Sequence, residues 1–189
     1  MSSQLSFGFS AAPARTQNDL LYFAVLPKPA AADKILNAGR RLKEEYRLSG
    51  RLYPAERLHV SLAGIGRFDG LHDEVIRAAR QIGDRIKGSP FEVRLDRALG
   101  FPAGHSRAVV LSFCEGVEAL VALHRQIAAI AKAPRQSFVP HLTLLYDRVF
   151  AADVELLEPI SWTVHEFVLV HSLYGQGRHR HLHRWRLTT

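Results

Sequence analysis

Two tetrapeptides of one pattern constrain the fold of this chain more than any other feature. They are His59-Val60-Ser61-Leu62 and His141-Leu142-Thr143-Leu144, and they begin 82 residues apart in a chain of 189. Each lies in a short apolar segment of the kind that forms a strand, and each comes after an earlier apolar strand and an amphipathic helix. One copy would be common by chance. Two copies in the same context indicate an internal duplication, and so predict two similar lobes facing each other across a cleft.

The expected elements follow hydrophobic periodicity and turn residues. We expect helix 33–46 to be capped by Asp33, and the segment 151–159 to be a short connection of about one helical turn. Helices and strands do not alternate regularly, which favours an α+β fold over a doubly wound parallel sheet. The expected strands are 20–26, 58–62, 91–95, 108–113, 140–146, 162–173 and 179–187, and the expected helices are 33–46, 71–86 and 117–131.

The domain organisation is predicted to be simple. Residues 1–18 are rich in Ser, Ala, Pro and Gln and predict a flexible arm, and residues 19–189 predict a single bilobal domain. No run reaches the roughly 18 apolar residues of a membrane span, and the N-terminus lacks the pattern of a secretory signal. The single cysteine, Cys114, fits a reducing compartment. We therefore expect a cytoplasmic monomer with no membrane partner.

The net charge of +7 favours anionic partners, with RNA or nucleotides ahead of membrane surfaces. Many soluble proteins are basic without binding nucleic acid, so charge alone raises this hypothesis only modestly.

The two motifs suit phosphodiester chemistry. Side chains two apart on a strand share a face, so His59 lies beside Ser61, and His141 beside Thr143. The intervening residues and the leucines face the other way and can anchor each motif. In-line hydrolysis of a cyclic phosphodiester needs a base on one side of phosphorus and an acid on the other, tasks that two histidines can divide. The hydroxyls of Ser61 and Thr143 would hold the non-bridging oxygens. No carboxylates cluster with the motifs, so neither a metal nor another cofactor is expected.

The sequence also resembles a known family from about Leu20 to Leu187. The resemblance rests on the paired His-x-Ser/Thr-Leu motifs, on the stretches 138–144 and 100–102, and on the ending Leu182-His-Arg-Trp-Arg-Leu187. The chain is similar to the 2H phosphoesterase superfamily, in its LigT-like branch of 2′-5′ RNA ligases or RNA 2′,3′-cyclic phosphodiesterases. The resemblance implies a bilobal fold with mainly antiparallel sheets around the cleft and helices outside. It implies hydrolysis of cyclic phosphate ends to a 2′-phosphate, with His59 as proton donor and His141 as proton acceptor.

One position departs from that family. LigT-like enzymes often have an arginine three residues after the second motif's threonine, where this chain has Tyr146 followed by Asp147. Arg148 could supply the missing charge. Tyr146 could stack on a base or simply pack in the fold.

The segment Arg178-His-Arg-His-Leu-His-Arg-Trp-Arg186 is the other conspicuous feature. As a regular strand it would place His179, His181 and His183 on one face and arginines on the other. Three histidines can bind zinc, but no Cys or carboxylate accompanies them. A basic strand near the cleft that attracts RNA is favoured, and a solvated edge strand protected by its charges is the alternative.

Two other residues receive structural interpretations. Cys114 follows an apolar run and is expected to be a buried strand-end residue rather than a nucleophile. His124 is expected to be packed on a helix with a satisfied hydrogen bond.

The leading hypothesis is an RNA 2′,3′-cyclic phosphodiesterase, possibly with reversible 2′-5′ ligase activity. A non-catalytic RNA- or nucleotide-binding module on the same fold is the second hypothesis. The third is an enzyme that acts on small cyclic nucleotides rather than RNA ends.

Overall fold

The structure is a computed structural model that describes residues 18–133 and 137–188. The expected arm 1–18 lies, except for its last residue, outside the described residues. In chain order the elements are β1 Asp19–Val25, α1 Pro29–Glu45, the 3₁₀ helix η1 Ala55–Arg57, β2 Val60–Phe68, α2 Asp73–Gly83, β3 Phe91–Ala103, β4 Ser106–Glu115, α3 Val117–Ile130, β5 His141–Asp147, β6 Asp153–Val164, β7 Glu166–Leu173 and β8 Arg178–Arg186.

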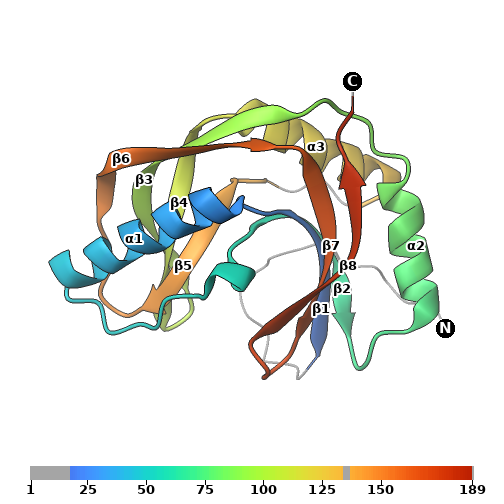
Figure 1. The fold of residues 1–189 in the computed structure, drawn as a ribbon. Coiled ribbons are helices and arrows are strands. Elements are labelled where there is room, and N and C mark those ends of the chain that lie inside the picture. Colours follow the sequence, from blue (N-terminus) through green and yellow to red (C-terminus); the bar gives the residue numbers. More distant parts are fainter. Residues whose placement is uncertain (1–17, 134–136, 189) are drawn as a thin grey trace.

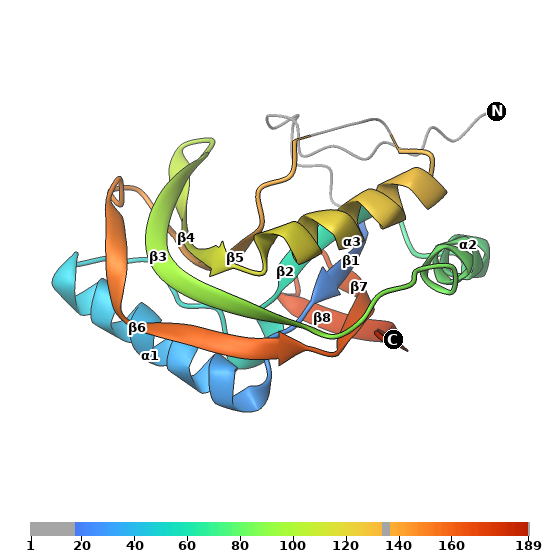
Figure 2. The same ribbon diagram turned by 90° about the horizontal axis from the view of Figure 1, so that it is seen from above.

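The eight strands form one sheet in the order β6-β3-β4-β5-β2-β1-β7-β8, and neighbouring strands are antiparallel. Its two motif strands, β2 and β5, meet in the middle through the single residue pair Val60 and Leu142. On either side of this junction lies a four-strand lobe, β5-β4-β3-β6 or β2-β1-β7-β8 (Figures 1 and 2). The predicted α+β class and bilobal arrangement are confirmed.

The lobes are not, however, the two halves of the sequence. The strand that begins at Phe91 pairs with β4 and β6, which come from the second half. The strand β7 pairs with β1, from the first half. Each lobe therefore contains strands from both halves, an exchange that periodicity along the chain does not reveal.

The main core lies on the helix-bearing face of the sheet. It gathers buried residues from all three helices and from alternate strand positions such as Phe23, Val60, Leu142 and Phe167. A small separate cluster on the other face consists of Tyr22, Ala24, Val168 and Val170, all from strands. The face with this second cluster is the one left available for a ligand. Within residues 18–133 and 137–188, no helix is long and apolar enough to cross a membrane.

Several predicted boundaries are wrong for local reasons. The first helix begins at Pro29 rather than after Asp33, because proline is well suited to the first helical turn, where its missing N–H is not needed. Residues 153–164 form the edge strand β6 instead of a helical turn, and the expected strand 162–173 is divided at His165 between β6 and β7. Cys114 is exposed, not buried.

Candidate active site

The register between β2 and β5 brings the two motifs onto one patch of the sheet. Counting outward from the pair Val60–Leu142, His59 lies across from Thr143, and Ser61 across from His141. The histidines therefore occupy one diagonal of a square and the hydroxyls the other, and diagonal neighbours in antiparallel sheets are typically about 7–8 Å apart. The structure thus supplies two imidazoles and two hydroxyls on one face.

The opposite face of each motif is anchored in the core as predicted. Val60, Leu62, Leu142 and Leu144 are at most 2% exposed. At about 25 cal/mol per Å² of buried apolar surface, each leucine stabilises the position of its strand by about 2 kcal/mol. The histidines therefore project from a rigid support.

A β-bulge follows each motif at the same position. Leu62 is skipped in the β1–β2 register, and Leu144 in the β4–β5 register. A bulge puts two successive side chains on one face, and accordingly Leu144 and Leu145 are both fully buried. The next residue, Tyr146, is thereby returned to the face of His141, where it is 46% exposed. Without the bulge this tyrosine would point into the core.

Both imidazoles are held by backbone carbonyls in equivalent ways. Nδ1 of His59 lies 2.8 Å from the carbonyl oxygen of Arg57, and Nδ1 of His141 lies 2.9 Å from that of Val139. A carbonyl only accepts, so Nδ1 carries the proton and each neutral ring has an unprotonated Nε2. Nε2 of His59 lies 3.1 Å from Oγ of Ser61, which donates to it. The arrangement prepares both Nε2 atoms for proton transfer.

The environment of His59 opposes a positive charge. Burial of the imidazole lowers its pKa to about 4; the neighbouring charges of His141, Arg57 and His181 add to this, and the hydrogen bond to the Arg57 carbonyl opposes it. His59 is therefore neutral near pH 7 when the site holds no anion. For His59 to donate a proton, a bound anion must raise this pKa.

The strands β1 and β8 form the wall beside His59. The ring of Tyr22 lies 5.1 Å from that of His59, and His179 meets the same ring edge-on at 5.2 Å. Oη of Tyr22 is 3.4 Å from Nδ1 of His179. Burial, with the charges of His59, Arg57 and His181, lowers the pKa of His179 to about 3. On the other side, Phe101 lies 5.1 Å from the ring of His141.

The prediction of three histidines on one face of β8 is wrong. The register between β7 and β8 skips Leu182, since Leu169 pairs with His183 and Val170 with His181. This bulge turns His183 toward Trp185, with ring centroids 4.5 Å apart, on the core side of the strand. Across the described parts of the chain, no group of three or more His, Cys, Asp or Glu residues is arranged to hold a metal ion.

The strand β5 ends in a buried carboxylate that fixes the position of Tyr146. Asp147 accepts hydrogen bonds from the backbone N–H of Gly50 at 2.8 Å and the hydroxyl of Ser49 at 3.2 Å, and also from the N–H groups of the two residues that follow it. These bonds, that of Gly50 first, lower the pKa of Asp147. Arg148 is exposed, and it takes part in none of the hydrogen bonds and ring contacts described above for His59 and His141.

The sequence interpretation missed Tyr22, Phe101 and Arg57 at this site. Tyr22 and Phe101 come from strands whose alternation shows which residues share a face but not which face meets the motifs. The sequence did contain a sign of the position of Arg57, because it precedes His59 by two residues and its side chain is therefore expected on the same side of the extended chain. His124 behaves as predicted, with Nδ1 donating to the carbonyl of Leu62 at 2.7 Å and its ring stacked on Phe138.

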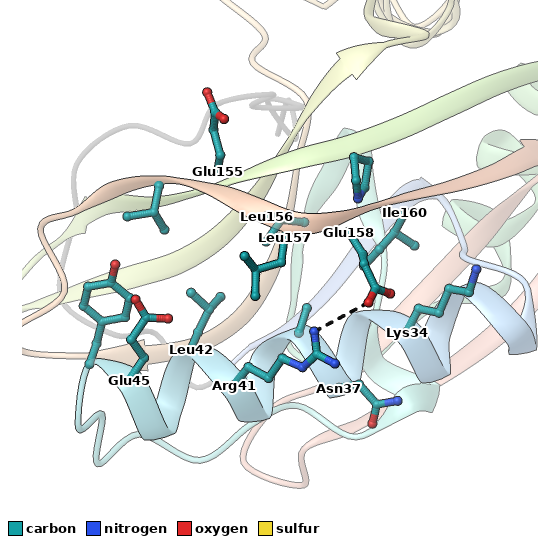
Figure 3. Close-up of a pocket in the computed structure, with 14 residues that line it drawn as sticks. Lys34, Asn37, Arg41, Leu42, Glu45, Glu155, Leu156, Leu157, Glu158 and Ile160 are labelled. Carbon is teal, nitrogen blue, oxygen red and sulfur yellow. Dashed lines mark ion pairs between the residues drawn. The ribbon is translucent and has the colours of Figure 1, made fainter.

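A cavity of about 400 Å³ lies elsewhere, between α1 and β6 (Figure 3). Its walls carry charges of both signs, and an ion pair of 3.9 Å joins Arg41 and Glu158 across it. None of the four motif residues lines this cavity. The site chemistry therefore belongs to the open sheet face and not to this cavity.

Comparison with known families identifies the chain. A family model described as the 2′-5′ RNA ligase superfamily matches residues 27–176. The chain belongs to this superfamily. Both motifs lie within the matched segment, so the family assignment includes the site.

Solved structures agree with membership in the 2′-5′ RNA ligase superfamily. Escherichia coli LigT complexed with ATP is 28% identical with a TM-score of 0.72, over 91% of this chain and 99% of that chain. A structure described as a phosphoesterase is 26% identical with a TM-score of 0.73, over 91% and 99% of the two chains. A Thermus thermophilus protein, TT0787, at 21% identity, TM-score 0.71 and coverage of 89% and 97%, supports the fold alone. No curated protein matches the sequence. The chain thus has the sequence family and the fold of the LigT-like 2H phosphoesterases.

Proposed function

We propose that this protein is an RNA 2′,3′-cyclic phosphodiesterase that opens cyclic phosphate ends to leave a 2′-phosphate. The observation that carries the proposal is the pair of imidazoles on one sheet face, each with Nδ1 bonded to a backbone carbonyl and an unprotonated Nε2. Relatives of the LigT type were solved with ATP and with 3′-AMP, which supports a nucleotide ligand.

In the proposed reaction, Nε2 of His141 removes a proton from water as its oxygen attacks phosphorus. The bond from phosphorus to the ribose 3′-oxygen breaks, and Nε2 of His59 protonates that oxygen as it leaves. Ser61 and Thr143 hold the non-bridging oxygens while negative charge accumulates on them. In the ligase reaction, the 5′-hydroxyl of a second RNA takes the place of water. It attacks the cyclic phosphate, the bond from phosphorus to the 3′-oxygen breaks, and the same two histidines remove and supply the protons, which leaves a 2′-5′ linkage.

The depressed pKa of His59 fits the donor role once the substrate is bound. The phosphodiester carries a negative charge, which favours the protonated imidazole and raises its pKa. The bound phosphodiester thereby favours protonation of His59, the acid that its cleavage requires. An imidazole that returns to the neutral state after turnover also releases the anionic product more readily.

The test is incubation with all four nucleoside 2′,3′-cyclic phosphates and with a short RNA bearing a cyclic phosphate end. We expect hydrolysis to the 2′-phosphate, assigned by ³¹P NMR, in the wild type and in a His105→Ala control, whose histidine is exposed in the turn between β3 and β4. Bound nucleotide without turnover would instead support the non-catalytic module. Turnover of mononucleotides but not of RNA would support the small-nucleotide enzyme.

A further inference from the structure

An arginine that has no acidic partner among the described residues lies beside the histidine pair. Arg57 is the last residue of η1, and its carbonyl accepts the Nδ1 proton of His59. Between the two, Leu58 has extended backbone angles and is 1% exposed. Because neighbours of an extended residue project to the same side, the side chain of Arg57 emerges on the face of His59.

The guanidinium is held in place by uncharged groups. It lies 4.0 Å from the centre of the Tyr53 ring, a cation–π contact. Its Nη1 is 3.5 Å from where a Cβ would lie at Gly177, in the turn between β7 and β8, so the guanidinium lies within van der Waals reach of this turn. The arginine is thus placed between the end of β5 and the turn that leads into β8.

The charge of this guanidinium influences the pKa values of several side chains around the site. Burial is the largest influence on the pKa values of four surrounding side chains, and the charge of Arg57 acts on each of them in the lowering direction. The four lie on different strands or strand ends, and they are His59, His179, Tyr22 and Tyr146. The positive charge therefore faces the ligand-binding side rather than the bulk solvent.

One donor of this guanidinium, Nε, is unused among residues 18–133 and 137–188. Nε of Arg57 is buried with no partner, and none of the ion pairs among residues 18–133 and 137–188 includes this residue. A buried charged donor without a partner is unfavourable, and a guanidinium forms its strongest bonds with carboxylate or phosphate oxygens. The environment of this guanidinium therefore favours binding of an anion.

We propose that Arg57 binds a non-bridging oxygen of the reacting phosphate, with the ring of Tyr53 supporting its guanidinium. This deepens the proposed function, because it identifies the cation that neutralises the phosphate where position 146 carries a tyrosine. It also assigns to Arg57 the role for which Arg148 was one candidate.

The test compares Arg57→Gln and Arg57→Lys with Arg51→Gln, an exposed arginine that controls for the loss of one charge. The first probe is inorganic phosphate, with binding followed by NMR shifts of the histidine rings. Losing a hydrogen bond to a charged partner should weaken phosphate binding about 10- to 100-fold in Arg57→Gln. Arg57→Lys should recover part of the affinity, since lysine keeps the charge but not the planar fork that stacks on Tyr53. Arg51→Gln should bind as the wild type does.

A second readout needs no ligand. Removing the positive charge should raise the pKa of His59 in Arg57→Gln and not in Arg51→Gln, which a purely structural role would not produce. Phosphate binding unchanged in folded Arg57→Gln, or lost in Arg148→Gln instead, would overturn the proposal. So would a loss confined to RNA substrates with further phosphates, because it would place Arg57 on a neighbouring phosphate. Phosphate bound through Arg57 in a protein without turnover would refute the cyclic phosphodiesterase and leave this assignment intact.

Discussion

Binding of an anion between the motifs should raise the pKa of His59 by about two units. The value starts at about 4 in the free protein, chiefly because burial disfavours the charged ring. A single negative charge about 5 Å from the imidazole, at an effective dielectric constant of about 20, stabilises the protonated form by about 3 kcal/mol. Since one pKa unit corresponds to about 1.4 kcal/mol, the bound-state pKa should be about 6.

The assay is an NMR titration of histidine ring signals with and without saturating inorganic phosphate, which carries at least one negative charge throughout. His59→Ala assigns the resonance. The sign of the linkage follows directly: a group whose pKa rises on binding takes up a proton, so phosphate should bind more tightly as pH falls from about 6 to about 4. For a shift of two units the gain approaches 100-fold, and it should be absent in His59→Ala. A His59 pKa that phosphate leaves unchanged, or one already near 6 in the free protein, would refute the reasoning.

Four further outcomes are expected. Single replacement of His59 or His141 by alanine should reduce turnover of a cyclic nucleotide about 10²–10⁴-fold, and the double variant should lose less than the product of the two; near-normal turnover in either folded variant would remove the pair from the mechanism. Ser61→Ala and Thr143→Ala should each reduce turnover by only about 10-fold, equivalent to one ordinary hydrogen bond of about 1.4 kcal/mol, because water can partly replace a hydroxyl; a loss as large as that of the histidines would contradict this view. Turnover should survive dialysis against EDTA, and a loss that zinc or magnesium restores would show that a metal takes part. Asp147→Ala should lower the free energy of unfolding by about 1–3 kcal/mol, because it leaves buried N–H groups unpaired. The pKa of Asp147 is lowered in the folded protein, so the greater stability of the wild type should be present above about pH 4 and should decrease as the pH falls below it. Denaturant titrations of both proteins at several pH values can check this.

The motif strands were predictable because their pattern is local. Alternation within 58–62 and 140–144 specifies which side chains share a face, and the burial of Leu62 and Leu144 agrees with it. The position of Tyr146 was not predictable by the same rule, because the bulge at Leu144 shifts the alternation by one residue. The bulge at Leu182 likewise invalidated the face assigned to His183. A bulge is set by the partner strand, and the partner is not visible in a single segment.

The pairing of strands between lobes was hidden for a related reason. Periodicity predicts that residues near Phe91 form a strand but contains no information about its neighbours in the sheet. The same holds for Arg57, whose position two residues before His59 was visible, while its contacts with Tyr53 and the turn at Gly177 depend on segments far apart in the chain. The local part of the site was thus predictable, and the part built from distant segments was not.

The exchange of strands between lobes has a consequence for synthesis of the chain. β1 is made well before β7, yet one of its edges pairs with Glu166–Leu173 of that strand. β3 likewise pairs with Asp153–Val164, which is made later. A nascent chain that ends before these residues exposes open strand edges, which can pair with other chains. Contacts this distant in sequence also make folding slow, because long loops must close before the contacts form. The first half of the duplication therefore cannot complete its own lobe, and the sheet is complete only after β6, β7 and β8 have been made.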